Sequence, residues 1–336
     1  MYRVLKLMVI GYLLIISWSC IKEDTVKMMP RYKDLTDRST SGINLRIPTI
    51  KHHLSSPNTH HFEIHASVYD QANSIIRNLN KYNFSLYVQC NNDNLICMES
   101  FNLWFCQGEM PLAVSIILDY SSNLEANKLL TIEDAIKRFI RLLGPDDFVQ
   151  IIKFADSVKV FHPFTNDIIQ IFEAIEAPFG GTESAYQDAT HKGISELAVF
   201  LDQATTQFSP MAIPIIAGTD SISSTHVYEI IALANKTQIP IYPIGIGTPN
   251  DFVINYTSLR NLAFHTGGKY FIPNQLSELE TCLSTIHGQS CGIYRLSWQM
   301  QEIECDFMQV FLEVRYDNGL GSHIGNTVKQ FVFPMD

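Results

Sequence analysis

The segment LAVSIILDYSSN, residues 112–123, has the most informative sequence pattern in this chain for its fold. Its first seven residues are mostly apolar and include Val and Ile, and an acid follows them directly. A short run of this kind is typical of a strand buried on both faces of a parallel sheet. Asp119, Ser121 and Asn123 come at the carboxyl end of that strand, where open α/β sheets bind ligands. Their oxygen side chains suit a hard divalent cation.

The chain beyond this segment alternates between apolar strands and amphipathic helices. Strands are expected within 147–164, 211–220 and 239–247, the second of which ends at Asp220. Helical apolar spacing occurs in six segments, at 124–143, 168–175, 185–201, 225–236, 258–265 and 277–287. This order predicts an α/β domain over 111–287, a doubly wound and mostly parallel sheet with helices on both faces.

The segments on either side of this domain have the two-residue alternation of β-strands. Residues 61–110 contain several short alternating runs with turn residues between them, and 288–336 contain three more. Neither segment has enough strands to bury a core alone. We therefore expect them to pair as one β-sandwich, with the α/β domain inserted between its halves.

The N-terminus has the pattern of an export signal. Arg3 and Lys6 precede a short apolar run, and Ser19-Cys20 follows it. Residues 1–20 are thus predicted to be a signal peptide with a relaxed lipobox, in which Cys20 is lipidated. Plain secretion, an uncleaved anchor and a cytoplasmic start are the alternatives. Residues 21–60 are mostly polar and are predicted to be a linker. The expected location is the cell envelope, as a membrane-anchored lipoprotein or a secreted protein.

Charge and motifs exclude several classes of function. The formal net charge is -10, with no basic stripe, which argues against a nucleic-acid partner. The sequence has no GxSxG elbow, P-loop or HExxH motif, so we expect no enzyme. The five histidines His52, His53, His60, His61 and His65 lack a regular helical spacing, and an incidental, solvated cluster is favoured over a metal site.

Six cysteines remain once Cys20 is set aside, and outside the cytoplasm an even number permits disulfides. Cys90 with Cys97 is the simplest local pair, and Cys106 could reach Cys282 or Cys291. Free, buried thiols are the alternative.

Three short motifs make residues 111–287 resemble a von Willebrand factor type A domain. The first is Asp119-Tyr120-Ser121-Ser122-Asn123, where the family has DxSxS after its first strand. The second is Phe179-Gly180-Gly181-Thr182, which is similar to the family's GGT loop. The third is Gly218-Thr219-Asp220, where the family has TD at a strand end.

The resemblance implies a metal-ion-dependent adhesion site. Its ligands would be Asp119, Ser121, Asn123, Thr182 and Asp220, directly or through water, around Mg²⁺ or, as substitutes, Mn²⁺ or Ca²⁺. The cation would leave a position for a carboxylate of a protein partner. Two residues depart from the family pattern: Asn123 replaces the second serine, and Ser221 replaces the usual glycine after the acid. Glu183 and Ser184 lie beside the threonine, and solvated loop positions are the favoured interpretation for both.

The leading hypothesis is therefore an exported, lipid-anchored adhesion or scaffold protein that binds a protein ligand at the loop edge of the α/β domain. One alternative is a metal-free structural component of the envelope, in which Asp119 and Asp220 only form loop hydrogen bonds or helix caps. Another is a metal-dependent hydrolase that uses His226 or His265 as a base.

Overall fold

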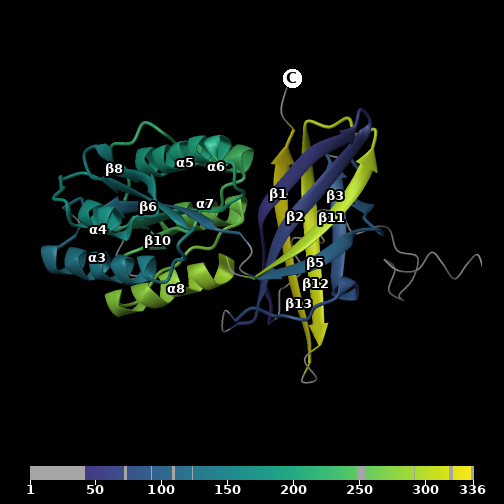
Figure 1. Cartoon of the computed structure of the whole chain (residues 1–336), viewed down its shortest axis with the longest axis horizontal. Helices are drawn as coiled ribbons and strands as arrows, with labels where there is room; N and C mark the ends of the chain where they lie inside the picture. The colour runs from purple at the N-terminus through teal and green to yellow at the C-terminus, as the bar shows by residue number, and fades with distance from the viewer. Residues whose placement is uncertain are drawn as a thin grey trace, which may run out of the picture.

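The computed structural model describes residues 42–333, apart from 72–73, 92, 108–109, 123, 248–253, 291 and 318–320. Two bodies lie side by side in it (Figure 1), a layered α/β body and a body made of β-strands. The chain begins in the β body, forms the α/β body, and returns to the β body. The predicted insertion of an α/β domain between two β segments is therefore what the described residues form.

The α/β body is built on a five-stranded sheet in the order β10-β9-β6-β7-β8. The strands are β6 (Leu112–Asp119), β7 (Phe148–Phe154), β8 (Val158–Thr165), β9 (Ser209–Ile216) and β10 (Ile244–Gly245). The central strand β6 is parallel to β7 and β9, and β8 is antiparallel to β7. The predicted doubly wound, mostly parallel sheet is confirmed.

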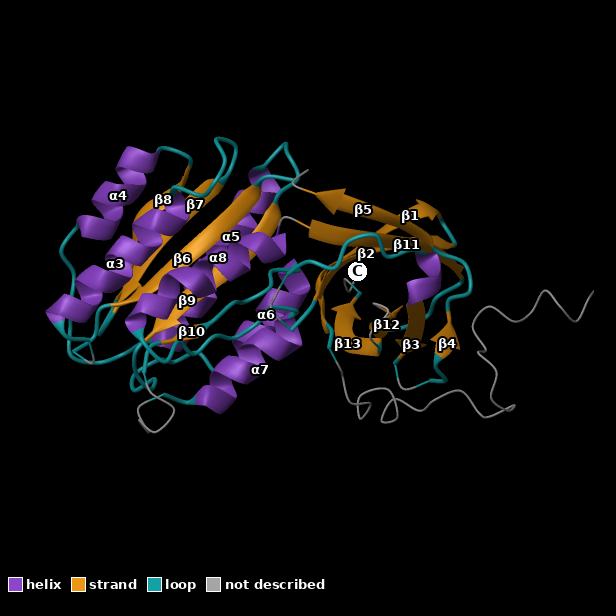
Figure 2. Ribbon diagram, turned by 90° about the horizontal axis from the view of Figure 1, so that it is seen from below, coloured by secondary structure: helices purple, strands orange, loops and turns teal. Residues whose placement is uncertain are grey.

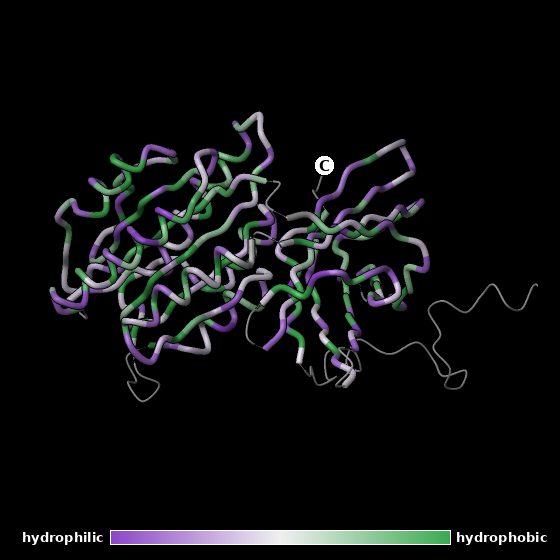
Figure 3. The backbone as a smooth tube through the Cα atoms, turned by 60° about the horizontal axis from the view of Figure 1, so that its bottom comes forward, coloured by the Kyte–Doolittle hydropathy of each residue, from purple (hydrophilic) through white to green (hydrophobic). Residues whose placement is uncertain are grey.

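Helices cover both faces of this sheet (Figure 2). They are α3 (Ala126–Ile140), α4 (Ile168–Glu176), α5 (Tyr186–Gln203), α6 (Val227–Thr237), α7 (Tyr256–Thr266), the 3₁₀ turn η2 (Leu276–Glu278) and α8 (Leu279–Ser290). All eight residues of β6 are buried. Val114 and Ile116 pack with α3, α4 and α8, whereas Ala113 and Ile117 pack with α5, α6 and α7. Hydrophobic residues accordingly run along the central strands (Figure 3), because both faces of the sheet are covered.

The β body consists of two four-stranded antiparallel sheets, in the orders β1-β2-β11-β5 and β13-β12-β3-β4. Its elements are β1 (Asn44–Ser56), β2 (Thr59–Tyr69), the 3₁₀ turn η1 (Lys81–Asn83), β3 (Phe84–Cys90), β4 (Ile96–Cys97), β5 (Asn102–Gln107), β11 (Gly292–Gln301), β12 (Phe307–Asp317) and β13 (Ser322–Val332). One core joins the inner faces of both sheets, including Phe62, Leu86, Trp298 and Val310. The N- and C-terminal segments thus share one sandwich, as predicted.

The prediction of a linker over 21–60 is wrong for its second half, because β1 occupies Asn44–Ser56. Leu45, Ile47 and Ile50 are buried along this strand, but a register shift between Arg46 and Thr49 breaks their alternation. The remaining residues are mainly polar, so the strand has no clean two-residue pattern. Residues 1–41, and with them the predicted signal and Cys20, lie outside the described residues.

The disulfide pairing differs from the simplest local arrangement. Cys90 is bonded to Cys305 and not to Cys97, which is itself disulfide-bonded. Cys282 is a free, half-buried thiol, so it is not the partner of Cys106. The reason is the strand pairing: Cys90 lies opposite Met308 in the β3–β12 ladder, which brings the residues just before β12 close to it.

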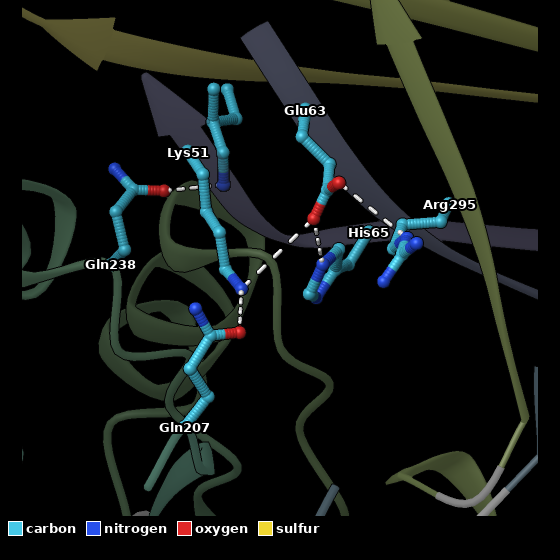
Figure 4. Close-up of polar contacts among 7 residues, drawn as sticks. Lys51, Glu63, His65, Gln207, Gln238 and Arg295 are labelled. Atoms are coloured by element: carbon cyan, nitrogen blue, oxygen red, sulfur yellow. Dashed lines mark hydrogen bonds and ion pairs between the residues drawn. The ribbon is translucent and has the colours of Figure 1, made fainter. Parts of the chain in front are cut away.

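The two bodies meet along β1 and β13. The amide of Ile50 donates to Gln238 Oε1 (2.7 Å), and Lys51 Nζ donates to Gln207 Oε1 (3.2 Å) (Figure 4). Lys51 also lies 4.0 Å from Glu63, a carboxylate bonded to His65 at 3.0 Å. These contacts join the first sheet of the sandwich to the segments that follow α5 and α6.

A buried lysine crosses the same junction. Lys329 Nζ, on β13, donates to the main-chain oxygens of Pro48 and Thr266, the latter at 2.9 Å. Burial lowers the pKa of Lys329 to about 7. This side chain thus links both sheets of the sandwich to the C-terminal end of α7.

Candidate functional site at the carboxyl ends of β6 and β9

Asp119 is the last residue of β6, and its carboxylate joins two strand ends. Oδ1 accepts a hydrogen bond from the amide of Ser121 (2.9 Å), and Oδ2 accepts one from the amide of Ala217, just after β9 (2.9 Å). The side chain is buried, and this burial raises the pKa of Asp119. Ser121 is buried beside it. Asp119 and Ser121 of the predicted first motif therefore lie below the surface of the loop edge, at the centre of the sheet, whereas Ser122 is exposed.

The loop that contains Thr182 is held by a carboxylate that the motif analysis missed. Asp156 Oδ1 accepts hydrogen bonds from Thr182 N (2.9 Å), Thr182 Oγ1 (3.2 Å) and Glu183 N (2.6 Å). The amides of Glu183 and Thr182 hold the pKa of Asp156 below its usual value. A Cβ on Gly181 would lie 2.6 Å from Asp156 Oδ2, so this close approach requires glycine.

The third predicted segment, after β9, is organised by Asp220. Its Oδ1 accepts from Ser223 N (2.9 Å), and its Oδ2 accepts from Ser223 Oγ (2.7 Å) and from Gln187 N (2.8 Å) at the start of α5. Asp188 supports the following residues, since it accepts from the amides of Ser224 and Thr225. Three of about four acceptor positions on the Asp220 carboxylate are thus occupied.

Hydrogen bonds bring the three loops together. Ser122 Oγ donates to Thr182 O (2.9 Å), which joins the first loop to the second. The amide of Ser221 donates to Ser184 O (3.0 Å), which joins the second to the third. The Asp119, Thr182 and Asp220 segments are thus linked to one another at one sheet edge. Asn123 lies outside the described residues.

The residues that sequence reasoning missed are Asp156, Asp188 and Ser223. Asp156 lies in the tight turn between β7 and β8, so it reads as an ordinary turn residue. Its position at the carboxyl end of β7, next to β6, is the signal that could have identified it. Asp188 lies in the first turn of α5, where an acid is also favoured by the helix dipole.

The donor set of this edge fits a hard cation. Asp119 accepts hydrogen bonds from the amide and the hydroxyl of Ser121 and from the amide of Ala217, so about one of its four acceptor positions remains. Thr182 Oγ1 donates its proton to Asp156, which leaves its lone pairs available. Ser184 Oγ is buried and has no hydrogen-bond partner among the described residues. Within those residues no three His, Cys, Asp or Glu side chains form a metal-binding group, so a cation here would depend on hydroxyl oxygens and water beside the carboxylates.

The histidines considered from the sequence are not among the residues that form the hydrogen bonds of the candidate site. His226 is the N-cap residue of α6 and stacks on Tyr228, and His265 lies in the last turn of α7. The prediction of an incidental, solvated histidine cluster is wrong for two members on the β1–β2 hairpin: His65 is buried against Glu63, and half-buried His52 packs on Phe62.

No helix in the described part of the chain is long and apolar enough to span a membrane.

Comparison with solved structures finds similar folds at low sequence identity. BatB from Bacteroides thetaiotaomicron is 21% identical with a TM-score of 0.42, over 53% of this chain and 98% of that chain. A von Willebrand factor type A protein from Catenulispora acidiphila is 11% identical with a TM-score of 0.48, over 88% and 75%. Proximal thread matrix protein 1 from the mussel byssus, in a form with a zinc-occupied MIDAS motif, is 17% identical with a TM-score of 0.47, over 57% and 49%. This chain thus spans about half the length of the mussel protein.

The family model of the von Willebrand factor type A domain matches residues 114–285, just over half of the 336 residues. The matched range begins within β6 and ends within α8, so it includes residues of all five strands and the three loops of the candidate site. The chain therefore belongs to the von Willebrand factor type A domain family.

Proposed function

We propose that this protein is a binding module that captures a protein ligand at the loop edge formed by the carboxyl ends of β6 and β9. Von Willebrand factor type A domains typically mediate protein–protein interactions. The observation that carries the proposal is the convergence of the Asp119, Thr182 and Asp220 segments through direct hydrogen bonds. A loop edge of this kind, on a scaffold with both sheet faces covered, is where α/β folds place ligands.

A divalent cation, Mg²⁺ by the chemistry of the donors, would be held by Asp119, Ser121 and Thr182, with Asn123 as a further oxygen donor. Asp220 would act through water, and its carboxylate also accepts three hydrogen bonds that hold the segment after β9 against the start of α5. Mg²⁺ keeps several waters and is bound by few protein ligands. The bound ion would supply a charged position for a carboxylate of the partner.

Export and a lipid anchor at Cys20 belong to the same proposal. The disulfide between Cys90 and Cys305 supports an oxidising compartment, because such bonds are rare in cytosolic proteins. The location we propose is the cell envelope, with the β-sandwich between the anchor and the binding domain.

A second candidate is a metal-free structural component of the envelope. The hydrogen bonds of Asp119 and Asp220 support it, because each carboxylate already has a structural role in its loop. In this case the loop edge would bind its partner through amides and hydroxyls alone.

Calorimetric titration of Mg²⁺ and Mn²⁺ into the purified chain separates the two candidates. We expect one site that is lost in Asp119→Ala and kept in Asp202→Ala, because Asp202 is exposed near the C-terminal end of α5, away from the loop edge. Capture of envelope proteins should then disappear with chelator and with Asp119→Ala. Capture that is unaffected by both treatments, with no heat of metal binding, would support the metal-free module.

A further inference from the structure

The interior of the α/β body contains a lysine that the site as described does not use. Lys153 lies on β7 and is fully buried. Its ammonium donates to the main-chain oxygens of Ile175 (2.7 Å) and Ala177, at the C-terminal end of α4. A cation is favoured at this end of a helix, where carbonyl groups lack helical partners. The contact therefore fixes the point from which the chain enters the loop that carries Thr182.

Aromatic rings surround the same ammonium. Lys153 Nζ lies 4.3 Å from the ring centroid of Tyr120 and 4.6 Å from that of Phe161. Phe179 completes the group, with edge-to-face contacts to Tyr120 (6.1 Å) and Phe161 (5.4 Å) between ring centroids. Cation–π attraction of a desolvated ammonium is stronger than at an exposed site. These three rings and Lys153 form what we call the lysine box.

A hydrogen-bonded acid closes the box. The hydroxyl of Tyr120 lies 2.7 Å from Glu133 Oε1 on α3 and 3.1 Å from Ile175 O. Burial, together with the bond to Glu133, raises the pKa of Tyr120. Both Tyr120 and Glu133 are buried. The box thus connects α3, the carboxyl end of β6, β7 and the end of α4.

The members of the box are neighbours of the proposed metal ligands in sequence. Tyr120 stands between Asp119 and Ser121, and Phe179 precedes Thr182 by three residues. A buried lysine is costly, and burial lowers the pKa of Lys153 to about 8. An apolar residue of similar length would fill this space without that cost. Packing alone would therefore not require a lysine at this position. The polar contacts of Lys153 instead fix the position of the Asp119–Ser121 segment relative to the loop that carries Thr182.

We propose that Lys153 is a positioning residue for the cation site, which holds the Asp119–Ser121 segment and the Thr182 loop in register through the lysine box. This inference rests on the proposed function for its cation and on the geometry above for the coupling of the loops. It identifies a residue outside the three family motifs on which the affinity of the site depends.

The test compares Lys153→Met with Lys329→Met in the full chain. Lys329 is the matched control, because it is also fully buried and also donates to two main-chain oxygens, but at the junction with the sandwich. Two quantities are measured for each variant: the affinity for Mn²⁺ by calorimetry, and amide hydrogen exchange of residues 119–122 and 178–184 without metal. Tyr120→Phe, which keeps the ring and removes the hydroxyl, is the second variant in case Lys153→Met does not fold.

We expect Lys153→Met to weaken Mn²⁺ binding by about 3- to 30-fold, in the range of residues that couple sites without contacting the ligand. Exchange should become faster in both segments, and Tyr120→Phe should change both quantities in the same direction. Lys329→Met should change neither quantity. Exchange in both segments as slow as in the wild type, or an equal effect of Lys329→Met, would overturn the proposal. If the wild type binds no Mn²⁺, the cation in the proposed function fails, and the exchange data still decide whether Lys153 couples the loops.

Discussion

Asp156 Oδ1 accepts hydrogen bonds from both the amide (2.9 Å) and the hydroxyl (3.2 Å) of Thr182. A residue at the β7–β8 turn therefore determines the orientation of the threonine side chain. The same oxygen also accepts from the amide of Glu183, so three donors depend on one acceptor. The carboxylate of Asp156 therefore anchors the GGT loop to the β7–β8 turn.

Removing that acceptor should release the loop. In Asp156→Ala we expect roughly several-fold faster exchange of the Thr182 and Glu183 amides, because hydrogen-bond loss lowers the cost of local opening. Asp156→Asn keeps an acceptor oxygen and should retain most of the protection. NMR-detected amide exchange checks both variants, and Asp202→Ala is the surface control. Equal exchange in the alanine and asparagine variants would show that the acceptor oxygen does not hold the loop.

Close packing of α5 on the central strand gives a second prediction. A Cβ on Gly193 would lie 2.6 Å from Ile117 Cδ1 and 2.9 Å from Ser115 Oγ, whereas one on Gly288 of α8 would meet nothing within 4 Å. Alanine gains helix propensity at both positions, but only at Gly193 does it crowd the core. Gly193→Ala should therefore be less stable than Gly288→Ala by about 1–3 kcal/mol.

Urea unfolding of the two variants measures this difference directly. Both changes add one methyl group to a helix, so the propensity contributions largely cancel in the comparison. Equal free energies of unfolding would mean that α5 shifts away from β6 at no cost, and that the contact at Gly193 does not limit the packing of the sheet.

The sequence predicted the α/β body well because its strands are covered on both faces. A buried segment such as Leu112–Leu118 must be mostly apolar, and its one polar residue, Ser115, is hydrogen-bonded to Gln150. The acid that follows marks the end of the strand. The strand at Asn44–Ser56 was missed for the opposite reason. One of its faces is polar, and the register shift after Arg46 removes the two-residue period by which a half-buried strand is detected.

The site residues that directly follow strands could be predicted from the sequence. The residues whose role depends on tertiary contacts could not. Asp119 and Asp220 are visible as acids at strand ends, whereas Lys153 reads as an unremarkable polar residue inside a strand. Its role depends on the end of α4 and on Tyr120, which lie far from it along the chain. The partner of Cys90 was hidden in the same way, because strand pairing rather than sequence proximity selects Cys305.

The Cys90–Cys305 disulfide should be a major contributor to the stability of the sandwich. It closes a chain segment with a sequence separation of 215 residues, between β3 and the residues before β12. Replacing both cysteines by serine should lower the free energy of unfolding by about 2–5 kcal/mol. Cys282→Ser is the control, since that thiol is free, and it should cost far less.

Denaturant unfolding under non-reducing conditions measures the effect, and peptide mapping of the unreduced chain identifies the bonded pair. A peptide linking Cys90 to Cys97 would contradict the pairing described above. Unchanged stability in the double serine variant would show that the β3–β12 ladder does not need its covalent link.

Lys329, at the junction of the two bodies, should make the free energy of unfolding of the protein depend on pH. Burial lowers its pKa from 10.5 to about 7 in the folded chain. Between these values the unfolded chain binds a proton at this site and the folded chain does not, so raising the pH favours the folded chain. The free energy of unfolding of the wild type should therefore rise, relative to that of Lys329→Met, by up to about 1.4 kcal/mol per pH unit in this window. Below pH 7 both states are protonated, and the difference between the two proteins should become constant.

Urea unfolding of both proteins from pH 6 to pH 10 measures this difference in free energy, because groups such as Lys153 titrate in both proteins and their contributions cancel. Parallel curves across the whole range would mean that Lys329 keeps an ordinary pKa, and that the amine is hydrated rather than buried between Pro48 and Thr266.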